Sequence, residues 1–271
     1  MLCPAPRNTY KGARQFAAPA HKPMIEHHNT IVIIPARMAA TRLPGKPMAD
    51  INGDPMIVHV WRRAVEAKIG HVLVAAAQYE IAQAVKAAGG DAIVTEPNLP
   101  SGSDRVAAAL ALRDSEQRFE HVVNLQGDLP TIDPLSVRRC LAGLTNSQVD
   151  ISTIAAKIDN DGDRNNPNVV KAIAPLKDRE VAFARDFVRV LSPEHEPPHW
   201  HHIGIYAYRR AALNRFVSLS PSVREQKRKL EQMRALDNGM KIAVVAVETV
   251  PLGVDTPVDL ETARRMLKDV T

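Results

Sequence analysis

The chain has few of the residues on which several classes of protein depend. Its 271 residues include two cysteines, Cys3 and Cys140, which cannot form a disulfide framework, so a reducing cytoplasmic compartment is expected. Aromatic residues are only 4% of the chain, too few for base-stacking platforms. No apolar run approaches the roughly 20 residues of a membrane span, and the N-terminus has no apolar signal segment. We therefore expect neither a membrane protein nor a secreted one.

The net charge of +5 does not indicate a nucleic-acid partner, because much of it lies at one end. Residues 1–30 carry a net charge of +3, which leaves +2 for the remainder, and no basic run alternates with aromatic residues. Residues 1–29 also lack apolar periodicity, so we predict a disordered extension there, with Met24 as an alternative natural start. We predict that residues 30–271 form one domain, although length alone would allow two.

From Thr30 onward, apolar runs typical of buried strands alternate with helical patterns. We expect strands over 31–35, 71–75, 92–95, 121–125 and 242–247, and helices over 55–68, 80–88, 103–113, 134–144 and 257–267. Repeated βαβ units of this spacing predict an α/β fold with a doubly wound, mostly parallel sheet and helices on both faces. Between them, strands over 151–158, 169–174 and 203–208 and a charged helix over 224–236 predict an inserted region of mixed strands.

The segment after the first strand is the most informative part of the chain. It places Arg37, Arg42 and Lys46 in one short loop that prolines and Gly45 interrupt. Open α/β sheets bind anionic ligands at the carboxyl ends of their strands, and arginine and lysine suit phosphate oxygens. The segment is neither a Walker loop, because Gly45-Lys46 is followed by Pro47, nor a Gly-x-Gly-x-x-Gly fingerprint. We interpret it as a triphosphate-binding loop; the alternative is a solvated basic loop.

Two aspartates also follow strands. Asp128 lies in a Gln-Gly-Asp turn after 121–125, and Asp255 lies beyond 242–247. Carboxylates at this edge of the sheet can hold a Mg²⁺ that bridges substrate phosphates. The alternatives are an ordinary turn at Asp128 and, at Asp255, a helix start with Thr256 as N-cap and Pro257 as first residue.

Other polar clusters are weaker signals. Ser101, Gly102 and Ser103 precede a helix and could offer free N–H groups to a ligand, but Ser103 is also a suitable N-cap. The acidic run 159–163 lacks the glycine and glutamate of a calcium loop, and we interpret it as a polar turn. The histidines at 195, 199, 201 and 202 have no matching ligand spacing, so one inward-facing histidine on a strand is favoured over zinc. Glu231 and Gln232 lie beside apolar residues on a charged helix and could point inward.

Six motifs in order give the chain a specific resemblance. They are 35–47, 52–60, Gln126-Gly-Asp128, Ile203-Gly-Ile-Tyr206-x-Tyr208, Leu230-Glu-Gln232 and Gly253-Val-Asp-Thr-Pro257. From about Thr30 to the C-terminus the sequence resembles the 3-deoxy-manno-octulosonate (Kdo) cytidylyltransferases, or CMP-Kdo synthetases. The resemblance implies one nucleotidyltransferase domain, a homodimer built through the inserted region, and Mg²⁺-dependent transfer of CMP from CTP to the 2-hydroxyl of Kdo. Pyrophosphate is released, and the product serves lipopolysaccharide synthesis.

The resemblance also implies site residues. The triphosphate would be held by Arg37, Thr41, Arg42 and Lys46, with Arg37 and Lys46 catalytic. The cytidine would lie near Ser101, Gly102 and Ser103, and the metal would be held by Asp128 and Asp255, which are also catalytic. The sugar would face Gln126, Arg185, His202, Tyr206, Glu231 and Gln232, with Arg185 as the cation for its carboxylate.

The chain departs from the family pattern at several positions. Leu129 stands where relatives commonly have glutamate, Ala76-Ala77 where they often have Thr-Asp, and Arg228 where glutamate is common. Three other functions remain: a cytidylyltransferase acting on sialic acid, a non-catalytic nucleotide sensor, and nucleic-acid binding. The 230–232 and 253–257 motifs favour Kdo, and the two aspartates argue against a sensor, because binding alone needs fewer metal ligands.

Overall fold

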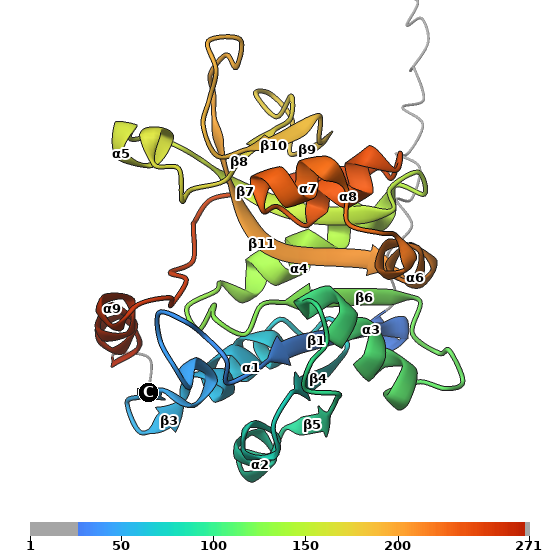
Figure 1. Ribbon diagram of the computed structural model, residues 1–271, viewed down its shortest axis with the longest axis vertical. Helices are drawn as coiled ribbons and strands as arrows, with labels where there is room; N and C mark the ends of the chain where they lie inside the picture. Colours follow the sequence, from blue (N-terminus) through green and yellow to red (C-terminus); the bar gives the residue numbers. More distant parts are fainter. Residues whose placement is uncertain (1–26, 269–271) are drawn as a thin grey trace, which may run out of the picture.

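A computed structural model of the chain describes residues 27–268 and builds them around one ten-stranded sheet (Figure 1). The strands are β1 (Thr30–Ala36), β4 (His71–Ala76), β5 (Asp91–Val94), β6 (His121–Leu125), β7 (Ile151–Lys157), β8 (Lys171–Ile173), β9 (Val181–Phe183), β10 (Asp186–Val188), β11 (Trp200–Arg209) and β12 (Ile242–Val247). Their order is β5-β4-β1-β6-β11-β7-β12-β9, with β8 pairing to β11 and β10 to β8. A separate hairpin pairs β2 (Asp50–Ile51) with β3 (Asp54–Pro55).

The sheet is mostly parallel, and one strand reverses its direction. β5, β4, β1 and β6 pair in parallel, and so do β7 and β12. β11 lies between these two groups and is antiparallel to both β6 and β7. The additional antiparallel strands β8, β9 and β10 come from the segment between β7 and β11. The predicted doubly wound sheet with a mixed-strand insertion is confirmed.

Helices cover both faces of the sheet. They are α1 (Met56–Glu66), α2 (Tyr79–Ala87), α3 (Gly102–Arg113), α4 (Pro134–Ala142), α5 (Asp161–Asn165), α6 (Arg210–Ser218), α7 (Val223–Arg228), α8 (Gln232–Asp237) and α9 (Pro257–Leu267). Short 3₁₀ turns occupy His27–Asn29, Lys46–Met48 and Gly143–Thr145. One core cluster joins α1, α2 and α4 to the sheet, and a second joins α3, α6 and α8 to its other face.

The apolar run of β1 explains this double layer. Ile31 and Ile33 lie in one core cluster, whereas Val32 and Ile34 lie in the other, and all four are completely buried. Successive side chains of a strand point to opposite faces, so a strand that is covered on both sides needs an unbroken apolar sequence. The same run carries the chain directly to the basic loop.

A third, smaller core cluster attaches the C-terminal helix. Leu260, Ala263 and Leu267 of α9 pack with Ile51 and Met56 beside the β2–β3 hairpin. Figure 1 shows a long segment leading from β12 to α9, which lies next to this hairpin. The hairpin turns at Asn52-Gly53, both with positive φ, a combination typical of tight two-residue β-turns.

Several elements differ from the sequence-based expectations. The predicted helix over 224–236 is two helices, α7 and α8, separated by Lys229 in the left-handed conformation at φ 54°. The N-cap of α3 is Ser101, not Ser103: the Ser101 hydroxyl accepts from the Asp104 amide at 3.2 Å. The acidic run 159–163 starts the short helix α5 under an Asn160 cap rather than forming only a turn. The hairpin, β9, β10 and α6 were not predicted.

The predicted N-terminal extension falls mostly outside the described residues. Residues 1–26, with Met24, and residues 269–271 lie outside the described part of the chain, and residues 27–29 form a 3₁₀ turn instead of continuing the extension. Among residues 27–268, no helix is long and apolar enough to cross a bilayer.

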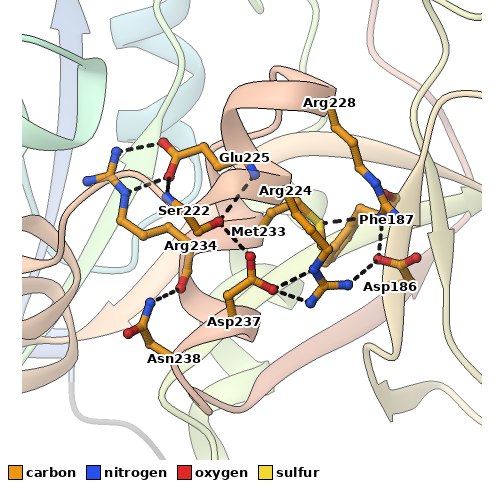
Figure 2. Close-up of polar contacts among 10 residues, drawn as sticks. All are labelled: Asp186, Phe187, Ser222, Arg224, Glu225, Arg228, Met233, Arg234, Asp237 and Asn238. Atoms are coloured by element: carbon orange, nitrogen blue, oxygen red, sulfur yellow. Dashed lines mark hydrogen bonds and ion pairs between the residues drawn. The ribbon is translucent and has the colours of Figure 1, made fainter.

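Ion pairs attach the α7–α8 segment to the insertion (Figure 2). Arg234 of α8 binds both carboxylate oxygens of Glu225 in α7, at 2.6 and 2.9 Å, and both side chains are largely buried. Arg228 binds Asp186 of β10 at 2.6 Å, and Arg224 bridges Asp186 and Asp237. A bidentate, buried pair such as Arg234–Glu225 fixes the relative position of the two helices. The two short helices therefore keep a fixed orientation against β10.

Candidate active site

The basic loop leaves the carboxyl end of β1 and folds back on itself. The Gly45 amide donates to the Met38 carbonyl at 3.2 Å, and Gly45 has φ +70°, a conformation that a side chain would strain. This closure brings Lys46, the first residue of a 3₁₀ turn, back toward the strand end from which Arg37 emerges. Arg37, Thr41 and Arg42 are exposed along the loop. Among the described residues, Arg37 has no ion-pair partner, so its charge is available to a ligand.

The neighbouring strand β6 brings Asp128 to the same edge. A Cβ atom on Gly127 would lie 2.8 Å from the Pro35 backbone oxygen, so only glycine allows the chain to pass this close to β1. Gln126 precedes it and donates from Nε2 to Asn124 Oδ1 at 2.9 Å. The Gln-Gly-Asp turn is thus fixed against the start of the basic loop.

Asp255 reaches this edge although β12 is three strands away from β6. The Val254 amide donates to the Asp128 carbonyl at 2.9 Å, and the Leu252 amide donates to Thr131 Oγ1 at 2.9 Å. These bonds attach the segment after β12 to the turn after β6. Thr256 forms a capping box with Asp259 at the start of α9, as the helix-start alternative predicted. The helix cap and the approach of Asp255 to Asp128 are compatible, because the cap uses Thr256 and Asp259 and does not involve the Asp255 carboxylate.

These segments surround a cleft of about 360 Å³. Nine predicted site residues line it: Arg37, Thr41, Arg42, Lys46, Ser101, Gly102, Gln126, Asp128 and Asp255. Four cationic side chains, including Arg105, face two carboxylates, which gives the lining a net formal charge of +2. Such a lining favours a highly charged anion. The N-terminus of α3 also opens into this cleft, since Ser101 and Gly102 are its cap and first residue.

Lys46 holds the two aspartates together. Its Nζ lies 2.8 Å from Asp128 Oδ2 and 3.0 Å from Asp255 Oδ1, and Arg42 binds the other oxygen of Asp255 at 2.9 Å. Burial alone would lower the pKa of the Lys46 ammonium, but the two carboxylates together outweigh it and raise that pKa above its usual value. Lys46 is therefore a permanent cation at neutral pH.

The two carboxylates fit a divalent cation. Both direct an oxygen at one ammonium nitrogen, so the oxygens already converge on a single positive charge. Mg²⁺ typically takes one or two carboxylates and completes its coordination with water and substrate phosphates. Among residues 27–268 no group of three or more His, Cys, Asp or Glu side chains is placed to hold a metal. Asp128 and Asp255 would therefore leave most coordination positions to substrate and water.

Four of the remaining predicted sugar residues form a second group behind the cleft: His202, Tyr206, Glu231 and Gln232. Glu231 accepts a hydrogen bond from the Ser103 hydroxyl at 2.8 Å, and Gln232 is buried. Tyr206 is opposite Asn124 in the β11–β6 pairing, and burial, followed by the charge of Glu231, raises the pKa of its phenol. Within residues 27–268, Asn124 Nδ2, Glu231 Oε1 and Gln232 Nε2 are buried without a hydrogen-bond partner. Unpartnered buried polar atoms cost stability unless a ligand or water completes them.

A bulge in β11 brings His202 close to Tyr206. The β11–β7 register shifts between Ile203 and Tyr206, and the two rings end with centroids 5.6 Å apart. His202 Nε2 lies 3.0 Å from Thr153 Oγ1, and the ring packs edge-on against Phe187. The predicted single inward-facing histidine is thus His202, held in the core by Thr153.

The core position of His202 predicts an acid-sensitive fold. Burial, and secondarily the charge of His201, lowers the pKa of His202 from 6.5 to about 3. Between pH 6.5 and 3 the unfolded chain therefore binds a proton that the folded chain does not, and stability falls as pH falls. By pH 5 this loss is about 2 kcal/mol. Urea unfolding at pH 7 and pH 5 should show a smaller decrease for His202→Gln than for the wild type.

Histidines elsewhere supply the control for this measurement. His71 lies at the start of β4 and bonds Asp91 at 2.8 Å rather than lying in the core, so His71→Gln is the matched control for replacing a histidine outside the core. An equal decrease for His202→Gln and the wild type would contradict the assignment.

Arg185 lies apart from the cleft. It lies between β9 and β10, donates its backbone N–H to the Ile173 carbonyl at 2.7 Å, and lines two other hollows, one within the insertion and one between the insertion and residues 142–149. The fold of the chain does not bring Arg185 to the group of predicted sugar residues behind the cleft. Leu129, where relatives commonly have glutamate, is buried in the core cluster with α1 and α4, and Arg228 pairs with Asp186. Neither departure alters the lining of the cleft.

Two residues of the site were not identified from the sequence. Arg105 lines the cleft, is 2% exposed, and donates to Thr95 Oγ1 and to the carbonyls of Glu96 and Pro97. Its position four residues after Ser101 places it on the same helix face, a signal that could have revealed it. Asn124, which orients Gln126, is the last residue but one of β6, and its signal in the sequence is an amide side chain within a buried run.

Comparisons with known proteins agree with this geometry. A family model described as cytidylyltransferase matches residues 31–242. The 3-deoxy-manno-octulosonate cytidylyltransferase of Paramagnetospirillum magneticum is 55% identical over 88% of this chain and 97% of its own, and that of Parvibaculum lavamentivorans is 56% identical over 93% and 97%. A solved CMP:2-keto-3-deoxy-manno-octonic acid synthetase in complex with CTP is 34% identical, with a TM-score of 0.81 over 90% of this chain and all of that one. The chain therefore belongs to the 3-deoxy-manno-octulosonate cytidylyltransferase family.

Proposed function

We propose that the protein transfers CMP from CTP to the 2-hydroxyl of 3-deoxy-D-manno-octulosonate, releases pyrophosphate, and so supplies CMP-Kdo for lipopolysaccharide synthesis. The observation that carries this proposal is the convergence of Asp128 and Asp255 on Lys46 inside a net-positive cleft. Relatives of 55–57% identity with the corresponding name support it.

The triphosphate is assigned to the basic loop. Arg37 and Arg42 are exposed there, Lys46 is held permanently charged, and Thr41 adds a hydroxyl donor. Guanidinium groups bind phosphate oxygens bidentately, whereas an ammonium acts as a point charge. The cytidine lies toward Ser101 and Gly102 at the N-terminus of α3. In this arrangement Arg37 and Lys46 stabilise the charge that develops on the phosphates during transfer.

Asp128 and Asp255 hold Mg²⁺ in this proposal. When bound, the ion would neutralise phosphate charge and would make the weakly nucleophilic sugar hydroxyl easier to deprotonate. Because the two aspartates come from different segments joined by the Val254–Asp128 bond, their separation is set by backbone rather than by side-chain freedom. Lys46 and Arg42 pair with these carboxylates before substrate arrives and can then turn to the phosphates.

The sugar is assigned to Gln126, Tyr206, Glu231 and Gln232. Gln126 lines the cleft and extends from it toward Asn124. It therefore connects the nucleotide cleft with the group of predicted sugar residues behind it. Glu231 Oε1 and Gln232 Nε2, which are buried and have no hydrogen-bond partner in the described part of the chain, match a ligand rich in hydroxyls, which can both donate and accept. His202 packs behind Tyr206, and Arg185 is left out of this set because it lines other hollows.

The reaction itself requires positioning more than a dedicated base. The sugar hydroxyl oxygen forms a bond to the α-phosphorus of CTP, the bond to pyrophosphate breaks, and the hydroxyl proton leaves to solvent. Holding the two substrates in line can supply much of the rate enhancement. The cleft holds the phosphates at the ends of β1 and β6, and Gln126 and Glu231 orient the sugar toward them.

A cytoplasmic homodimer completes the proposal. β9 lies at the end of the sheet with Val181 and Phe183 more than two-fifths exposed, and an apolar edge of this kind favours association. Cys140 is buried, and burial raises the pKa of its thiol, which suits a reducing compartment. Light scattering on the purified protein should give twice the chain mass of 29.7 kDa; a monomer mass would contradict the dimer.

Pyrophosphate release tests the function directly. The protein would be incubated with CTP and Mg²⁺ and with either Kdo or sialic acid. Release with Kdo alone is the expected result. Release with sialic acid alone would assign the protein to the other sugar, and no release with either, together with clear CTP binding by calorimetry, would indicate a nucleotide sensor.

A further inference from the structure

The first turn of α3 has two sides with different surroundings. Ser101 and Gly102 line the cleft, and the space beside Gly102 is closed by Gln126, whose amide atoms would lie 3.6 and 3.8 Å from an added Cβ. Ser103 does not line the cleft and is 1% exposed. Ser103, which was expected near the cytidine together with Ser101 and Gly102, therefore points away from the cleft, toward the group of predicted sugar residues behind it.

Ser103 contacts Glu231 there. Its hydroxyl donates to Glu231 Oε2 at 2.8 Å, between segments 128 residues apart in the chain. The other oxygen, Oε1, is buried and has no partner among residues 27–268. A carboxylate accepts several hydrogen bonds, and bonds to a charged group are stronger than neutral ones. One oxygen is thus held by the protein while the other remains an acceptor for a ligand.

Tyr208 approaches the serine from β11. Its phenol lies near Ser103 and Glu231, and burial, followed by the charge of Glu231, keeps the pKa of the phenol well above its usual value. Tyr208 therefore stays a neutral phenol beside the Ser103–Glu231 hydrogen bond.

The backbone before Glu231 is fixed independently. Lys229, two residues earlier, adopts φ 54°, which is costly for a residue other than glycine. Arg189 of the insertion donates to the carbonyls of Arg228 and Lys229 at 3.0 and 3.2 Å, and Arg228 in turn is anchored on Asp186 (Figure 2). With the backbone held, the freedom left to Glu231 lies in its side-chain torsions, and the bond to Ser103 restricts these.

We propose that Ser103 is a positioning residue for the sugar substrate. It fixes the Glu231 carboxylate so that Oε1 accepts from a hydroxyl of the sugar, and it connects this acceptor to the turn whose other side lines the nucleotide cleft. The inference rests on the proposed function, because Glu231 meets the sugar only if the protein uses one.

Ser103→Ala tests the proposal. The change removes the donor to Glu231 and leaves Ser101 and Gly102 in place, so KM for Kdo should rise about tenfold or more. The dissociation constant of CTP, measured by calorimetry, should change less than about twofold, because the nucleotide contacts are intact. Ser103→Thr, which keeps the hydroxyl, should restore KM toward the wild-type value. If Ser103→Ala does not fold, Ser103→Cys, whose thiol is a weak donor, carries the same expectation.

A double-mutant cycle separates positioning from a general structural role. In a Glu231→Gln background, Ser103→Ala should add less than about threefold to KM for Kdo, because the carboxylate that it orients is gone. Ser136→Ala, at an equally buried serine in the first turn of α4, is the matched control and should leave both constants unchanged.

Two results would overturn the inference. One is an unchanged KM for Kdo in Ser103→Ala; the other is a loss of CTP affinity as large as the loss for Kdo. Both are measured only after the wild-type protein has been shown to release pyrophosphate with Kdo. Failure of that first reaction would instead reject the proposed function.

Discussion

Asp128→Asn is expected to reduce kcat about 10³-fold while the protein remains folded and binds CTP. The substitution keeps the size of the side chain and removes a charge that converges with Asp255 on one point of the cleft. An amide oxygen is a weaker ligand for a hard cation than a carboxylate. Pyrophosphate release over a Mg²⁺ titration would measure the effect, with saturation displaced to higher metal concentration. The backbone bond from Val254 to the Asp128 carbonyl does not involve the side chain, so the turn should persist.

Asp133→Asn provides a matched control five residues away. Asp133 caps α4 by accepting from the Leu135 amide at 2.9 Å and does not line the cleft. Asparagine caps helices about as well as aspartate, so kcat should be unchanged. If Asp128→Asn altered CTP affinity but not turnover, the catalytic role of Asp128 would be rejected. The result would favour the alternative that the protein is a nucleotide sensor.

Lys46→Met is expected to lower kcat/KM for CTP between about 10²-fold and 10³-fold. Methionine retains an unbranched apolar stem but no charge, so the phosphates lose the ammonium that the two carboxylates keep protonated. The free protein should also lose stability, since Asp128 and Asp255 would then face each other without the cation between them. Thermal melts in the absence and presence of Mg²⁺ would show this, with the metal restoring more stability to the variant than to the wild type.

Lys86→Met controls for the loss of one positive charge. Lys86 is exposed in the last turn of α2, away from the cleft, and its replacement should leave kcat/KM within about twofold of the wild type. Retention of wild-type kcat/KM by Lys46→Met would remove this lysine from the proposed triphosphate site.

The elements that the sequence predicted well are those whose pattern is local. β1 carries an apolar run buried on both faces, and α9 begins with a capping residue followed by proline. The basic loop could be predicted because Arg37, Arg42 and Lys46 follow a strand end directly. All three line the cleft, because the bond from the Gly45 amide to the Met38 carbonyl folds the loop back toward the end of β1.

What could not be predicted depends on contacts between distant segments. Lys229 adopts a conformation typical of glycine, and the residues around it do not predict the break between α7 and α8. The break is stabilised by contacts with Asp186 and Arg189, which come from a distant segment of the chain. Ser103 fits a helix cap as well as Ser101 does, and only the approach of Glu231 distinguishes their roles. The Asn52-Gly53 hairpin, by contrast, has a local signal, because this dipeptide favours positive φ at both positions of a tight turn.

The pairing of Lys46 with Asp255 has a consequence for how the protein matures. The two residues are 209 positions apart, so their contact closes most of the chain into one loop. A polypeptide emerging from the ribosome can pair β1 with β4 and β6 long before Asp255 has been synthesised. The cleft then has its cations but only one of its two carboxylates. Competence for the reaction is thus acquired only after the segment that follows β12 has been synthesised, returns across the sheet and docks α9 on the hairpin.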